Sequence, residues 1–274
     1  MRTQLVSIET DSQPLDGLYY EPEHGPLKGA VQLFHGNTMN FYVGPLKFLP
    51  PALTDLGYAC LAYNRRGHDI LSTRDSREAE GGAFQTFEEA FADNRIAREW
   101  LQEQGFDAPV VIGHSNGGVL ATRHTVDYPD TPALALLSAH RGGRNVFKLM
   151  SENGLMAQNR YAEFEAAARA MLAQDKGDTL LHLPGWWYTL TARSYVEYLD
   201  RCPDILTLAP QVSCPVLYVV GDEEPGDLYP ARAFEAAAAG PVRVETISNC
   251  GHFYVGRETS VCEAVTNWLG TLAG

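Results

Sequence analysis

The hydrophobic and polar positions along the chain predict short buried strands that alternate with amphipathic helices. The apolar run at 109–112 is too short for a helix and is typical of a strand covered on both faces, and 30–34 and 59–63 are interpreted as further strands of this kind. In 87–104, apolar residues recur at helical spacing, and Gly105 closes the helix. We therefore expect an α/β fold whose doubly wound, mostly parallel sheet has helices on both faces. The predicted strands are 4–10, 15–20, 30–34, 59–63, 109–112, 133–137, 216–220 and 243–247, and the predicted helices include 48–56, 87–104, 118–125, 161–174, 231–239 and 258–272.

One interval, 140–214, breaks this alternation. It contains two or three helical patterns, such as 161–174, together with a cluster of aromatic residues. We predict that it forms a helical cap, inserted into a core made of 1–139 and 215–274. Most of the aromatic rings are expected to pack in the core, and three are candidates for lining a substrate pocket. These candidates are Trp186, Trp187 and Tyr188.

The clearest chemical signal lies in the middle of the chain. Residues 113–117 read G-H-S-N-G directly after a predicted buried strand and before a predicted helix. This strand–turn–helix context is that of the G-x-S-x-G nucleophile elbow. The sharp turn places Ser115 at a strained backbone angle, and the helix N-terminus beneath it favours developing negative charge. The sequence therefore predicts Ser115 as a nucleophile.

A serine hydroxyl needs a base within hydrogen-bond reach, and the base needs an orienting acid. His252 is the candidate base, because it lies in the loop between strand 243–247 and the last helix. The acid is expected in the loop after strand 216–220, where four carboxylates stand within 221–227. Glu224, Asp222 and Asp227 are its candidates.

The tetrahedral intermediate of acyl transfer carries an oxyanion that two backbone N–H groups can stabilise. We expect one donor to be the amide of Asn116, directly after the nucleophile. The other is expected at Asn37, because Gly36 lets the chain turn tightly at the end of strand 30–34.

The charge and the cysteine content of the chain indicate which classes of partner are excluded and in which cell compartment the protein is expected. A formal charge of −13 argues against nucleic acid and against an anionic membrane surface as partners. No run of 18 apolar residues and no signal peptide is recognisable, so we expect no membrane span.

Five scattered cysteines without a C-x-x-C pair are typical of reduced thiols in a cytoplasmic protein. H-E-x-x-H and clustered Cys/His ligands are lacking, so neither a metal nor another cofactor is expected.

Together these motifs resemble the α/β-hydrolase superfamily over nearly the whole chain. His35-Gly36 resembles its oxyanion motif, and N-R-R-G-H at 64–68 resembles its D-x-R-G-x-G segment, with Asn64 where Asp is usual. The family's Gly-x-x-Asp acid pattern selects Glu224, again where Asp is usual. The serine nucleophile disfavours the dehalogenase and epoxide hydrolase branches, which use Asp.

The resemblance implies a serine hydrolase that cleaves a carboxylic ester of a small molecule through an acyl-enzyme. Lactone, amide and C–C bond hydrolysis use the same residues, and some receptors of this fold bind a ligand with little turnover. Arg141 and Arg144 follow strand 133–137. They either pair with a substrate carboxylate or form surface ion pairs.

Overall fold

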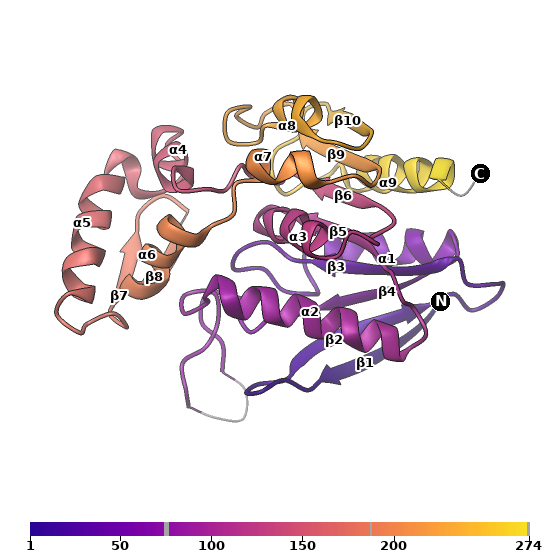
Figure 1. The fold of residues 1–274 in the computed structure, drawn as a ribbon, viewed down its shortest axis with the longest axis horizontal. Helices are drawn as coiled ribbons and strands as arrows, with labels where there is room; N and C mark the ends of the chain where they lie inside the picture. The colour runs from indigo at the N-terminus through magenta and orange to yellow at the C-terminus, as the bar shows by residue number, and fades with distance from the viewer. Residues whose placement is uncertain (74–76, 187, 273–274) are drawn as a thin grey trace.

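A computed structural model describes residues 1–73, 77–186 and 188–272 of the chain (Figure 1). Within them, one sheet of eight strands runs in the order β1-β2-β4-β3-β5-β6-β9-β10. The first two pairings, β1 with β2 and β2 with β4, are antiparallel, and the other neighbours are parallel. The strands are β1 (Arg2–Ile8), β2 (Leu15–Glu21), β3 (Gly29–Phe34), β4 (Tyr58–Tyr63), β5 (Val110–His114), β6 (Leu134–Leu137), β9 (Val216–Gly221) and β10 (Val242–Ile247). This sheet confirms the predicted fold class.

Helices cover both faces of the sheet, and each face has its own hydrophobic core. On one face, α1 (Pro45–Asp55) packs beside α9 (Glu258–Leu272). The other face carries α2 (Phe87–Glu103), α3 (Asn116–Asp127) and α8 (Ala231–Ala237) (Figure 1). Strands β3 to β6 are buried along almost their whole length, because both of their faces meet helices.

The bounds of most elements differ by one to three residues from those predicted. Helix α1 is an instance: it begins at Pro45 rather than at residue 48. Proline suits the first helical position, where its missing N–H would have no partner. The last helix, α9, has the predicted bounds.

Most of the interval predicted as a cap, from α4 to α6, lies at one end of the molecule (Figure 1). Its helices are α4 (Val146–Glu152), η1 (Ala157–Asn159), α5 (Tyr161–Leu172) and α6 (Ala192–Arg201). Between α5 and α6 the chain forms an antiparallel hairpin, β7 (Leu180–Leu183) with β8 (Tyr188–Thr191), which the purely helical expectation missed. Helix α7 (Ile205–Leu208), followed by η2 (Ala209–Gln211), packs instead against α3 and α8. The division at 139 and 215 stays a prediction.

Candidate active site

Ser115 occupies the turn between β5 and α3. Its backbone has φ 56° and ψ −122°, a conformation that a non-glycine residue rarely adopts. The flanking glycines make this turn possible. A Cβ atom on Gly113 would lie 2.2 Å from the Gly117 carbonyl oxygen, and a Cβ atom on Gly117 would lie 2.2 Å from the Phe34 carbonyl oxygen. Both positions therefore require glycine.

Three side chains from three loops form one hydrogen-bonded chain. His252 Nε2 lies 3.0 Å from Ser115 Oγ, and His252 Nδ1 lies 2.8 Å from Glu224 Oε1. A carboxylate only accepts hydrogen bonds, so Nδ1 carries the proton and Nε2 is left to accept from the serine hydroxyl. The side chains of His252 and Glu224 are 12% and 3% exposed.

The two alternative acids make other contacts. Asp222 Oδ1 accepts a hydrogen bond of 3.1 Å from the backbone N–H of Cys250. Asp227 Oδ2 accepts one of 3.3 Å from Asn153 Nδ2. Of the three candidates, Glu224 is the carboxylate that hydrogen-bonds His252.

Glu224 is held by groups that sequence reasoning missed. Its second oxygen, Oε2, accepts hydrogen bonds from Ser138 Oγ at 2.6 Å and from the backbone N–H of Gly221 at 2.8 Å. The Tyr254 hydroxyl lies 2.6 Å from Ser138 Oγ in turn. Ser138 directly follows β6 and therefore lies at the carboxyl edge of the sheet, where the sites of such folds are found. This position in the sequence could have marked it as a candidate site residue.

Two further histidines lie close to His252. The ring of His114 is 4.9 Å from that of His252, and its Nε2 lies 3.0 Å from the His252 carbonyl oxygen. Burial, reinforced by His252, lowers the pKa of His114 to about 3. The same causes lower the pKa of His140, which follows β6 and lines the cavity described below, to about 3. Both rings are neutral at pH 7, so they add no charge beside His252.

The two expected oxyanion donors both lie next to Ser115. Asn116 is the first residue of α3. Asn37 directly follows Gly36, whose backbone lies so close to Ser115 that a Cβ atom on Gly36 would be 3.1 Å from Ser115 Cβ. Neither backbone N–H donates a hydrogen bond to another described residue. The buried Arg65 steadies the Asn37 loop, because its Nη2 donates a hydrogen bond of 2.7 Å to the His35 carbonyl oxygen.

A cavity of about 340 Å³ lies over Ser115, between the sheet edge and the inserted segment. Trp186 and Tyr188 line it, whereas Trp187 lies outside the described residues. Arg141 is not among its lining residues and forms an ion pair of 3.3 Å with Asp204. The lining consists of Asn37, Thr38, Met39, Ser115, His252 and Phe253 from the core and of His140, Phe147, Met150, Met156, Gly185, Trp186 and Tyr188 from the insertion.

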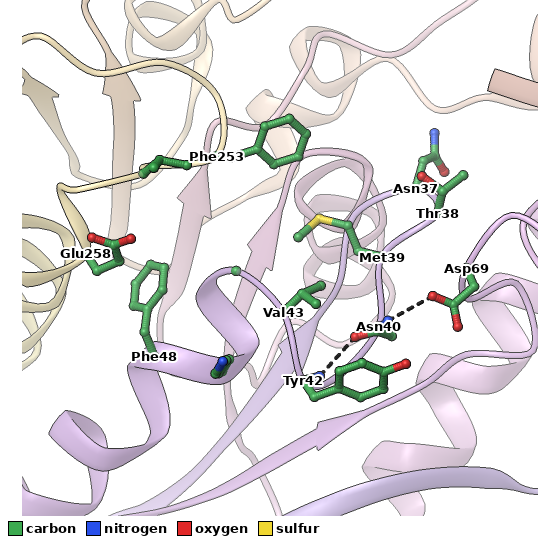
Figure 2. A pocket seen from close by; sticks show the side chains of 13 residues that line it. Asn37, Thr38, Met39, Asn40, Tyr42, Val43, Phe48, Asp69, Phe253 and Glu258 are labelled. Carbon is green, nitrogen blue, oxygen red and sulfur yellow. Dashed lines mark hydrogen bonds between the residues drawn. The ribbon is translucent and has the colours of Figure 1, made fainter. Parts of the chain in front are cut away.

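A second, more open groove of about 850 Å³ continues from this cavity along the Asn37–Met39 segment (Figure 2). Figure 2 shows Met39 and Phe253 among the side chains that line it and the Asn40 side chain hydrogen-bonded to Asp69. The groove carries Lys47, Asp69 and Glu258, whereas the cavity contains no Lys, Arg, Asp or Glu among its lining residues. The two spaces therefore differ in polarity.

Two kinds of feature are missing from the part of the chain that is described. No cluster of three or more His, Cys, Asp or Glu side chains is arranged to hold a metal ion. No helix in that part combines the length and the apolar character needed to cross a membrane.

Comparison with known proteins points to one family. The model of the alpha/beta hydrolase family matches residues 33–264. The sequence has no significant match among curated proteins. Similar solved structures include ferulic-acid-bound Est1E from Butyrivibrio proteoclasticus, with a TM-score of 0.72, 18% identity and coverage of 98% of this chain and 99% of that chain.

Two further structures show the range of activities on this fold. A thermostable carboxyl esterase from Bacillus coagulans in complex with glycerol has a TM-score of 0.75, with 16% identity and 99% of both chains covered. A proline iminopeptidase from Mycobacterium smegmatis has a TM-score of 0.66, with 13% identity and 98% of both chains covered. At such identities the likeness concerns the fold, and activity has to be argued from the site.

Proposed function

The chain belongs to the alpha/beta hydrolase family, and on that premise we propose that it hydrolyses carboxylic esters of small molecules through an acyl-enzyme on Ser115. The observation that carries the proposal is the pair of hydrogen bonds, 3.0 and 2.8 Å long, that join Ser115 to His252 and His252 to Glu224. Nucleophile, base and orienting acid stand in that order in a serine hydrolase.

In the first half of the reaction, Ser115 Oγ attacks the ester carbonyl carbon while its proton passes to His252 Nε2. Glu224 stabilises the imidazolium through Nδ1. The backbone N–H groups of Asn37 and Asn116 stabilise the oxyanion, a contribution of about 3–4 kcal/mol for each donor in comparable sites. The tetrahedral intermediate then expels the alcohol, which takes the proton from Nε2.

In the second half, water attacks the acyl carbon and gives its proton to His252 Nε2. The new tetrahedral intermediate breaks its bond to Ser115 Oγ, which recovers that proton, and the carboxylic acid leaves. Each step uses the same two hydrogen bonds, so no metal or cofactor is required.

The two spaces beside Ser115 suggest the kind of ester. The cavity has an apolar lining rich in methionine and aromatic side chains, which favours an uncharged apolar group. The groove has charged and amide side chains, so it suits the more polar part of the substrate. The structural neighbours that are esterases, one of them with ferulic acid, agree with a small-molecule substrate.

Steady-state kinetics on p-nitrophenyl acetate test the proposal. We expect sustained turnover, covalent labelling of Ser115 by a fluorophosphonate, and loss of both in Ser115→Ala. Ser213→Ala is the matched control and should keep full activity, because this exposed serine lies just before β9, at the amino ends of the parallel strands and so at the sheet edge opposite Ser115. A burst of one equivalent without turnover would instead favour a ligand-binding protein, and undiminished activity in Ser115→Ala would exclude this nucleophile. A panel of esters, lactones and amides then separates the related reactions.

A further inference from the structure

One side chain of the inserted segment contacts both expected oxyanion residues. Tyr198 lies on α6, and its hydroxyl accepts a hydrogen bond of 2.6 Å from Asn37 Nδ2. The same hydroxyl donates a hydrogen bond of 2.5 Å to Asn116 Oδ1. Asn37 and Asn116 precede Tyr198 by 161 and 82 positions in the sequence, and the single hydroxyl oxygen of Tyr198 links them.

From this bridge we propose that Tyr198 is a positioning residue, which holds the backbone N–H groups of Asn37 and Asn116 at the spacing that an oxyanion requires. It does not touch the substrate. The inference rests on the proposed function, because the two N–H groups matter only if a tetrahedral intermediate forms at Ser115.

The chemistry of the bridge leaves little freedom. Burial raises the pKa of Tyr198 well above its usual value, so the phenol stays neutral. A neutral phenol has one proton to donate and can also accept, and both capacities are used. Asn37 donates through its amide NH₂, and Asn116 accepts through its carbonyl oxygen. The orientation of both amides is therefore fixed by one hydroxyl.

The ring that carries this hydroxyl is itself clamped. Tyr198 is 7% exposed. Its ring stacks on Phe147, with centroids 4.8 Å apart, and meets the edge of Phe87 at 4.9 Å. Phe147 also lines the catalytic cavity. The bridge thus has a rigid support, which preorganised oxyanion donors need if they are to stabilise the transition state without reorganisation.

Without the bridge, the two donors depend on separate supports. Asn37 stands in a loop after β3, whereas Asn116 is fixed at the start of α3. Loss of the hydroxyl leaves the Asn37 loop with its Arg65 hydrogen bond but without the tie to α3, so the spacing of the two N–H groups is less well fixed. Transition-state binding is then weakened, while binding of the substrate in the cavity is little affected.

Tyr198→Phe tests this, with Tyr195→Phe as the matched control. Tyr195 is another buried tyrosine of α6, and its hydroxyl donates to the Tyr161 carbonyl oxygen, away from the oxyanion residues. We expect kcat to fall about tenfold to hundredfold in Tyr198→Phe, with KM changed less than about twofold. Tyr195→Phe should change neither.

The affinity for an arylboronic acid is a second measurement, which separates loss of the oxyanion donors from a general loss of packing. The boronic acid forms a tetrahedral adduct with the nucleophilic serine, so its affinity should fall by the same factor as kcat in Tyr198→Phe. The affinity for the alcohol product, which has no carbonyl or carboxylate oxygen to accept from the oxyanion donors, should stay the same. If kcat and boronate affinity in Tyr198→Phe equal those of Tyr195→Phe, the inference is wrong.

Asn116→Ala is a second variant that tests the same bridge if Tyr198→Phe folds poorly. Asn116→Ala removes the acceptor of the bridge but keeps the backbone N–H, and it should lower kcat by a similar factor. In the double variant the two losses should not multiply, since either change alone breaks the bridge. Full multiplication would overturn the inference. If wild type and Ser115→Ala bind the boronic acid equally, the proposed function fails instead.

Discussion

Ser138 Oγ donates a hydrogen bond of 2.6 Å to Glu224 Oε2. His252 uses the other oxygen of the same carboxylate. Ser138 therefore limits the rotation of Glu224 and keeps Oε1 facing the imidazole. Ser138 makes this contact from its position directly after β6, and its hydroxyl has no hydrogen bond to His252 or Ser115.

We expect Ser138→Ala to lower kcat about tenfold, which corresponds to about 1.4 kcal/mol, because a carboxylate that has lost this donor orients His252 less well. Steady-state kinetics on p-nitrophenyl acetate measure the effect. Ser151→Ala is a suitable control, since Ser151 is also fully buried and its hydroxyl has no hydrogen-bond partner among the described residues. Equal activity of the two variants would argue against the role of Ser138.

The identity of the acid can be tested by three isosteric changes. Glu224→Gln should lower kcat about 10³- to 10⁴-fold, because an amide stabilises neither the required tautomer nor the imidazolium. Asp222→Asn and Asp227→Asn should stay within about twofold of wild type, since their carboxylates bond to Cys250 and Asn153. A large loss in either Asp variant, with an active Glu224→Gln, would move the acid to that position.

Stability should fall on mild acidification. Burial, together with Arg98, lowers the pKa of His124 to about 3, and the pKa values of His114 and His140 are lowered to about 3 as well. These rings stay neutral in the folded chain but take up protons in the unfolded chain below its pKa near 6.5. Their contribution is complete above pH 6.5 and is lost as the pH falls toward 3.

Each of these histidines should therefore contribute a loss of about 1.4 kcal/mol per pH unit below about pH 6. Urea unfolding at pH 7 and pH 5 measures it. His124→Gln removes one such group away from Ser115, so this variant should lose about 1 kcal/mol less per pH unit than wild type. The same slope in both proteins would show that His124 titrates normally.

Arg141 offers a test of the substrate's charge. Because it pairs with Asp204 and is not among the cavity-lining residues, we expect Arg141→Ala to change kcat/KM by less than about twofold on neutral and acidic esters alike. A selective loss on acidic esters would show that the guanidinium leaves Asp204 to bind a substrate carboxylate.

The elbow could be predicted from the sequence because its constraints fall at fixed spacings from Ser115. Gly113 must lack a side chain because of its contact with the Gly117 carbonyl, and Gly117 because of its contact with the Phe34 carbonyl on the neighbouring strand β3, so both positions leave a readable motif. The alternation of strands and helices was equally readable, since buried parallel strands need short apolar runs.

The remaining features depend on contacts between distant segments. The residues within 221–227 left Glu224, Asp222 and Asp227 open as the acid, and the family pattern selected Glu224. The path of the loop is what turns Glu224 toward His252. The hairpin β7–β8 was missed because each strand has four residues, fewer than a periodic pattern needs to be recognised. Tyr198 stood among several aromatic residues, and nothing in the chain distinguished its hydroxyl from theirs.

The bridge from α6 has a consequence for protein engineering. Exchanging the insertion for that of another hydrolase is a common way to look for new substrates. In this enzyme such an exchange would also remove the hydroxyl that joins Asn37 to Asn116. A chimera would need a tyrosine at the corresponding place. Without it, we expect the chimera to have a lower kcat even where it binds new substrates.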